Sequence, residues 1–147
     1  MELQIKKTEA LLSIINEYFK SVSDTVLEFK PSENKWSKKE ILGHLIDSAM
    51  HNLVRFTEIN YLEKPYHHRP YSQIDLVNLN QYQTMDTDEL VQLWLSLNKQ
   101  IIRVFKNIDD ESLDYQIILS DQSVIDLKFL ITDYVEHLEY HINQILN

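Results

Sequence analysis

Apolar residues recur along this chain at intervals of three and four, a spacing that predicts four long amphipathic helices. The predicted helices cover about residues 6–22, 37–62, 86–107 and 123–146. In the first of them, a single apolar stripe is formed by Leu11, Leu12, Ile15, Tyr18 and Phe19. The chain has one glycine and three prolines, too few for the turns that a sheet protein needs, so an all-α fold is expected.

Capping signals mark the predicted starts of three of these helices. In a capping box, the first side chain caps the helix and an acidic side chain three residues later reaches back to it. Three pairs have this spacing: Ser37 with Glu40, Asp86 with Glu89, and Ser123 with Asp126. Pro65 ends the pattern of the second helix, because proline cannot donate a helical hydrogen bond.

The connectors indicate how the helices are joined. Residues 63–85 form a connector of 23 residues, more than two adjacent antiparallel helices require, so we expect a crossover. A further connector, residues 109–122, contains the β-prone run 115–119, which is expected to be extended or to form a small hairpin arm. The pattern therefore predicts an all-α four-helix bundle with long crossover connections, as one domain over residues 1–147.

Composition and charge exclude several classes of function. The net charge of −9 leaves no basic surplus for nucleic acid phosphates or an anionic membrane surface, so neither is an expected partner. Without cysteine the chain has no disulfide, zinc ribbon or thiol nucleophile. No apolar run approaches the roughly 18 residues of a membrane span, and the amino terminus lacks a signal-peptide core. We therefore expect a cytoplasmic protein.

Two histidines in the fourth predicted helix are candidate metal ligands. His137 and His141 are four residues apart, so they lie one above the other on a single helix face. This is the spacing with which one helix supplies two imidazoles to one metal ion. The pair lies on the flank of the apolar stripe Ile131, Val135, Leu138, Ile142 and Ile145. The alternative is that both are ordinary half-buried or surface histidines.

The second predicted helix carries a polar stripe beside its apolar face, formed by His44, Asp47, Ser48, His51 and Arg55. A solvated helix face with ordinary contacts between neighbouring turns is the simpler interpretation. Gly43, the only glycine of the chain, lies in the helix interior, where it costs about 1 kcal/mol relative to alanine. A glycine there permits the close approach of another backbone or of a ligand, although tight helix packing explains it equally well.

Taken together, the two helices predict a metal held by one histidine of the second helix and two of the fourth. Three neutral imidazoles leave a coordination position open, as in catalytic zinc sites, whereas structural zinc is closed by four ligands.

The runs Lys35–Asp47 and Asp133–Gln144 resemble the DinB/YfiT-like family, which is unrelated to the polymerase of similar name. The shared features are the tryptophan–serine start, the Gly43–His44 step and the late pair of histidines, and the resemblance covers nearly the whole chain. It implies a bundle that binds a divalent metal, most often nickel or zinc, through His44, His137 and His141. It also implies a frequent homodimer. Characterised relatives include S-transferases that use a low-molecular-weight thiol, and relatives described as metal-dependent hydrolases.

Four further residues are candidates for roles around the metal. Asp133 and Asp47, each one turn from a histidine, are candidate acceptors for the second N–H of the imidazoles. Gln144 is a candidate for orienting bound water or substrate, and Tyr134 for shaping the pocket, with core packing as its alternative. His67 and His68, in the long connector, are expected to lie in a solvated loop or at the mouth of a site.

Two hypotheses of different classes follow. In the first, the protein is an enzyme whose divalent metal activates a low-molecular-weight thiol or water for attack on a small substrate. Because the chain has no cysteine, any thiolate must arrive on a cosubstrate. In the second, the protein is a non-catalytic helical bundle that binds a small ligand or a protein partner.

Overall fold

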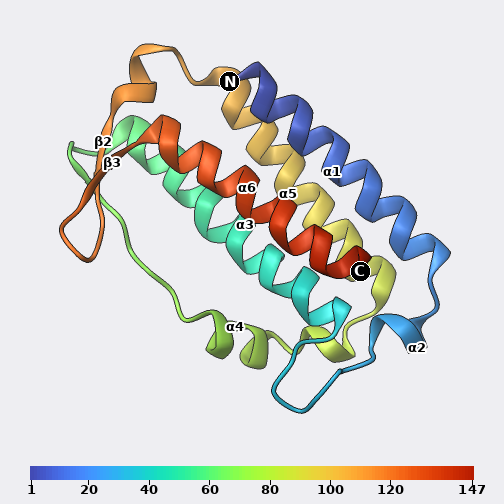
Figure 1. Ribbon diagram of the computed structural model, residues 1–147. Helices are drawn as coiled ribbons and strands as arrows, with labels where there is room; N and C mark the ends of the chain where they lie inside the picture. Colours follow the sequence, from blue (N-terminus) through green and yellow to red (C-terminus); the bar gives the residue numbers. More distant parts are fainter.

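The computed structural model describes residues 1–147 and contains the four long helices that the pattern predicts (Figure 1). They are α1 (Glu2–Ser21), α3 (Lys38–Tyr61), α5 (Thr87–Asn107) and α6 (Leu127–Leu146). The predicted apolar stripe of α6, residues Ile131, Val135, Leu138, Ile142 and Ile145, is at most 2% exposed and forms part of a continuous apolar core. No helix is long and apolar enough to cross a membrane.

The four helices form a bundle in which α3 and α5 run parallel. Each of α1 and α3 packs against both α5 and α6, so α1 and α3 lie diagonally opposite. Figure 1 shows that α3 and α5 begin at the same end of the bundle and that α1 and α6 run the other way. The connector between α3 and α5 must therefore return along the full length of the bundle. The predicted four-helix bundle with a long crossover is confirmed.

Two of the predicted helix starts are confirmed. The Ser37 side chain accepts a hydrogen bond from the Glu40 backbone N–H, and the Glu40 side chain accepts one from the Ser37 N–H, a complete capping box. The Asp86 side chain caps α5.

The predicted start of the last helix at Ser123 is wrong. Asp126 caps α6 by accepting a hydrogen bond from the Phe129 N–H, three residues further along than expected. The reason is that the preceding residues Val124–Asp126 are extended and paired in a hairpin, so they cannot form the first turn of a helix.

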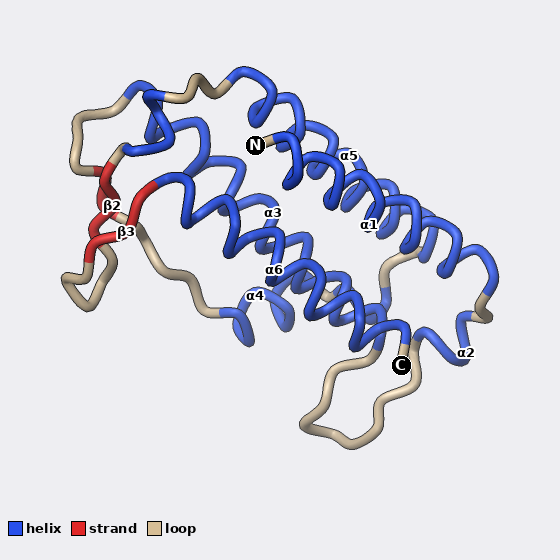
Figure 2. Tube along the Cα trace, turned by 45° about the horizontal axis from the view of Figure 1, so that its top comes forward, coloured by secondary structure: helices blue, strands red, loops and turns tan.

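The connectors contain short elements that the pattern did not resolve. These are α2 (Asp24–Leu27), β1 (Tyr66–His67), α4 (Gln73–Asn80), η1 (Tyr82–Thr84), η2 (Glu111–Asp114), β2 (Gln116–Ile118) and β3 (Val124–Asp126). Strands β2 and β3 form an antiparallel hairpin, as the β-prone run suggested, and β1 pairs with β2 in parallel. Figure 2 shows the hairpin at one end of the bundle, where α6 begins.

The long connector is anchored to α3 at the only glycine. Tyr82 is buried against Gly43, and a Cβ at that position would lie 2.2 Å from the tyrosine ring. The Tyr82 hydroxyl donates a 2.6 Å hydrogen bond to the carboxylate of Asp47, one turn further along α3. Gly43 therefore allows close packing, one of the two roles that its position indicated. The group that packs against it is the aromatic side chain of Tyr82.

Candidate metal centre

His44 of α3 meets His137 and His141 of α6 inside the bundle. All three residues offer a ligand nitrogen, and these atoms lie within 4.8 Å of one another. The Nε2 atoms of His44 and His137 are 3.1 Å apart. His44 is completely buried, and the two histidines of α6 are half-buried. No other group of histidine and acidic side chains in the chain converges in this way.

The positions of the Nε2 atoms fit a metal site. The Nδ1 atoms of His44 and His137 are buried and have no protein partner, so neither ring has the acceptor that often fixes a metal-binding histidine. Two nitrogens that bind one ion at about 2.0–2.1 Å lie about 3 Å apart, as the Nε2 atoms of this pair do. Gln144 accepts a 2.7 Å hydrogen bond from Nδ1 of His141 through its Oε1 atom, which leaves Nε2 of that ring with a free lone pair.

The electrostatics of the cluster keep the imidazoles neutral. Burial, with contributions from the neighbouring His137 and His141, lowers the pKa of His44 to about 3. Burial, with a contribution from His141, lowers the pKa of His137 to about 4. Burial also lowers the pKa of His141. Neutral imidazole is the form that binds a metal, so the cluster is in its ligand form at neutral pH.

The two candidate carboxylates do not contact the histidines. Asp47 is completely buried, but its Oδ1 atom accepts hydrogen bonds from Tyr82 and from Asn80, and not from His44. Asp133 lies on the exposed side of α6 and makes no hydrogen bond to His137. One turn of spacing is therefore not enough to bring a carboxylate to a histidine: Asp47 is held by the long connector, and Asp133 is exposed.

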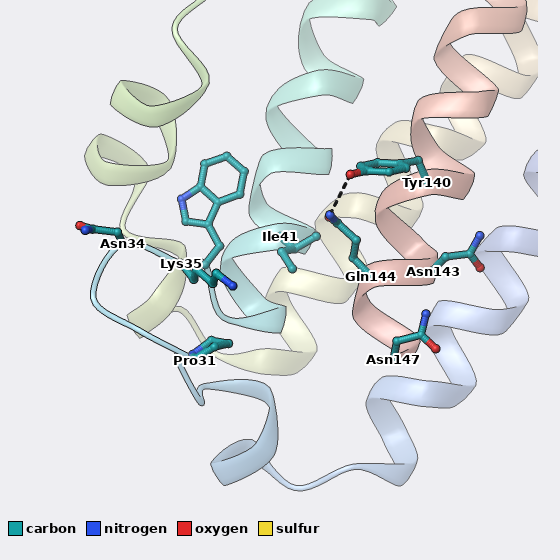
Figure 3. Close-up of a pocket in the computed structure, with 9 residues that line it drawn as sticks. Pro31, Asn34, Lys35, Ile41, Tyr140, Asn143, Gln144 and Asn147 are labelled. Atoms are coloured by element: carbon teal, nitrogen blue, oxygen red, sulfur yellow. Dashed lines mark hydrogen bonds between the residues drawn. The ribbon is translucent and has the colours of Figure 1, made fainter.

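A pocket of about 780 Å³ lies beside the histidines, between α3, α6 and the loop before α3. The indole of Trp36 lines it and lies 5.1 Å, centroid to centroid, from the His44 ring. Figure 3 shows Gln144 and Tyr140 on α6 facing Ile41 of α3 across this space. Gln144 donates a hydrogen bond of 3.2 Å to the Tyr140 hydroxyl, so it joins the pocket wall to His141.

None of the side chains that line this pocket is acidic, although the chain has a net charge of −9. Its polar groups are one lysine, a tyrosine hydroxyl and four amides: Lys35, Tyr140, Asn34, Asn143, Gln144 and Asn147. The sequence singled out Gln144 but did not connect Trp36 with the histidines. The sequence did contain a signal for this contact. Trp36 directly precedes Ser37, the cap of α3, so it lies at the same end of the helix as His44.

The remaining candidates lie elsewhere. Tyr134 is only 2% exposed, packs edge-on against Phe56 and donates a 2.7 Å hydrogen bond to Asn98, so it belongs to the core and not to the pocket. His67 is exposed in β1 and His68 is half-buried beside it, and neither joins the three-histidine cluster.

The C-terminal part of the polar stripe of α3, formed by His51 and Arg55, is not a solvated face. Tyr71 of the long connector stacks on His51 with the ring centroids 4.1 Å apart, and Arg55 is 6% exposed. The sequence pattern did not reveal this cover, because a connector with little periodicity does not show which helix it lies on.

Comparisons with known proteins agree with this architecture. The sequence model of the DinB superfamily matches residues 7–145. The structure resembles that of YfiT from Bacillus subtilis, described as a probable metal-dependent hydrolase with an unusual four-helix bundle topology. The TM-score is 0.88 and the identity 21%, over 99% of this chain and 83% of YfiT.

The structure is also similar to that of a mycothiol-dependent maleylpyruvate isomerase, with a TM-score of 0.76 and 11% identity. That match covers 98% of this chain and 60% of the isomerase, which is a longer protein. At 21% and 11% identity, these two comparisons show a similar fold and nothing more. No curated protein matches the chain in sequence.

Proposed function

Because the chain belongs to the DinB superfamily, we propose that it is a metal-dependent enzyme whose divalent metal is held by His44, His137 and His141. The observation that carries this proposal is the convergence of three histidine nitrogens within 4.8 Å, with two Nε2 atoms 3.1 Å apart on rings that burial keeps neutral. Nickel or zinc suits three imidazole nitrogens.

The three imidazoles leave part of the coordination sphere for a substrate atom. When bound there, the metal supplies a Lewis acid that holds a thiol as thiolate or lowers the pKa of water. Two side chains of the chain support this site: Gln144 fixes the His141 ring, and the Trp36 indole packs against the His44 ring. The pocket holds the substrate body against its amides and against Lys35, the one charged side chain in the wall.

The pocket supports a polar or anionic small molecule as the substrate, because it is rich in amides and free of acidic side chains. A low-molecular-weight thiol with amide or carboxylate groups fits that description. The absence of cysteine from the chain adds to this, since the thiol must then come from outside. We therefore propose a thiol S-transferase first and a hydrolase second, the latter supported by the likeness in fold to YfiT.

The first experiment measures metal content by elemental mass spectrometry on protein purified without a histidine tag. We expect about one nickel or zinc per chain, lost in His137→Ala and retained in His67→Ala, whose histidine is exposed and outside the cluster. No metal in the natural protein, and none taken up on addition, would overturn the proposal and leave the non-catalytic binding bundle.

The second experiment separates the two reactions. Metal-loaded protein is assayed for thiol-dependent consumption of an aryl halide and for cleavage of an activated ester without thiol. Activity in the first assay that is absent in His137→Ala supports the transferase. Ester cleavage alone, with no activity with bacillithiol, mycothiol or glutathione, supports the hydrolase. Light scattering on the same preparations tests the further proposal of a homodimer. A single cooperative unfolding transition tests the proposal of one folded domain over residues 1–147. Fluorescent tagging in cells tests the proposed cytoplasmic location.

A further inference from the structure

Arg55 of α3 is a buried charge without a counter-ion. It is 6% exposed, and none of the six ion pairs of the chain involves an arginine. Its guanidinium makes two hydrogen bonds, of 2.5 Å to the backbone oxygen of Arg69 and of 3.4 Å to the side-chain oxygen of Asn52. A guanidinium has five N–H donors, so most of its capacity is unused by the protein. A buried and unpaired charge of this kind is expensive unless something else compensates it.

Arg55 lines a cavity of about 280 Å³ that is separate from the metal centre. The cavity is lined by Met50, His51, Val54, Arg55, Glu58, Tyr66 and Arg69. Arg55 follows His44 by 11 residues on the same helix, a separation of about 16 Å along the axis. Asp47 and His51 lie between these two residues along α3, and Tyr71 stacks on His51, which lines the cavity.

The charges around the cavity favour an anion with a single negative charge. Two arginines line it, against one carboxylate, that of Glu58, which already accepts a 2.7 Å hydrogen bond from the Tyr66 hydroxyl. The face of the Tyr71 ring lies 5.4 Å from the Arg55 guanidinium and holds it in place without neutralising it. Glu58 opposes a second negative charge on a ligand. Met50 and Val54 add an apolar wall.

We propose that this cavity binds a small organic acid, with one oxyanion head group on the Arg55 and Arg69 guanidiniums and a short apolar body against Met50 and Val54. A planar carboxylate matches the forked donors of a guanidinium. The site is independent of the three histidines and of the reaction proposed for them.

The proposal is tested by calorimetric titration of metal-free protein with sodium benzoate at constant ionic strength. We expect saturable binding that is about ten- to a hundred-fold weaker in Arg55→Met, which keeps the apolar stem but removes the charge. Arg69→Gln, a change at an exposed position that is expected to fold normally, should weaken binding as well. Arg103→Met, which removes an exposed arginine of α5 outside the cavity, is the matched control and should bind as the natural protein does.

Three results of the benzoate titrations would overturn the proposal. The first is no saturable binding of benzoate. The second is binding that both Arg55→Met and Arg69→Gln leave unchanged. The third is binding that is lost in His137→Ala, because this would place the anion at the histidines. Two further probes test the ligand class: neutral benzamide should not bind, and inorganic phosphate binding as tightly as benzoate would overturn the assignment of an apolar body.

Discussion

Replacing Gly43 by alanine should destabilise the protein, although alanine is the better helix former. The perturbation is one methyl group in the interior of α3. On propensity alone the change stabilises a helix by about 1 kcal/mol. Against this, the new Cβ would lie 2.2 Å from Cδ2, 2.3 Å from Cγ and 2.6 Å from Cβ of Tyr82. Rotation of the ring cannot relieve the last of these contacts, because the tyrosine Cβ is attached to the backbone of the connector.

The magnitude follows from what Tyr82 loses when it moves. Non-bonded carbon atoms rest about 3.5–4.0 Å apart, so the residue must retreat by about 1 Å or more. Its hydroxyl then leaves Asp47, and an unsatisfied buried group costs about 1–3 kcal/mol. Partial exposure of the ring, now 4% exposed, adds about 1–2 kcal/mol. After subtraction of the gain in propensity, we expect Gly43→Ala to lower the free energy of unfolding by about 1–4 kcal/mol.

The assay is urea unfolding of the metal-free protein, followed by circular dichroism, in a double-mutant cycle. In a Tyr82→Ala background the clash is absent, so the same Gly43→Ala change should be neutral or should stabilise by up to about 1 kcal/mol. A Gly43→Ala protein that is as stable as the natural one, or a loss of equal size in both backgrounds, would refute the packing argument.

Three further outcomes are expected. Burial lowers the pKa of His44 to about 3 and of His137 to about 4 in the folded chain, so between about pH 6.5 and 4 the unfolded chain binds protons that the folded chain does not. The unfolding free energy of metal-free protein should therefore fall as the pH drops through this window, by no more than about 2.7 kcal/mol per pH unit for the two groups, and less steeply in His44→Ala. Gln144→Leu removes the acceptor that fixes His141 and should weaken metal binding about 10- to 100-fold in a chelator competition, without loss of fold. Tyr134→Phe leaves Asn98 without its donor and should lower stability by about 1–3 kcal/mol while the metal content stays unchanged, and a loss of metal would contradict its placement in the core.

The local features of the fold could be predicted from the sequence because they depend on neighbouring residues. Helix periodicity and the capping pairs at Ser37 and Asp86 involve atoms within one turn, and the structure contains them where expected. The start of α6 at Ser123 failed where pairing with a strand competed with the local signal, and α1 begins at Glu2, four residues before the predicted start. The spacing of His137 and His141 is local in the same sense.

The site itself depends on tertiary structure. His44 is 93 residues away from His137, and only the packing of α3 against α6 brings their Nε2 atoms together. Periodicity records which side of a helix is buried, but not what buries it. Asp47 does not contact His44 for this reason, because its buried carboxylate finds its partner in another element, here Tyr82.

The sequence by itself therefore determined the four long helices, the caps of α3 and α5, the composition of the candidate metal site and the need for a crossover. The tertiary structure decided that Gly43 receives an aromatic ring, that Tyr134 belongs to the core, and that the connector covers Arg55. The physical reason is range: hydrogen bonds and sterics within a turn are set by adjacent residues, whereas burial and charge pairing depend on which distant segments pack together.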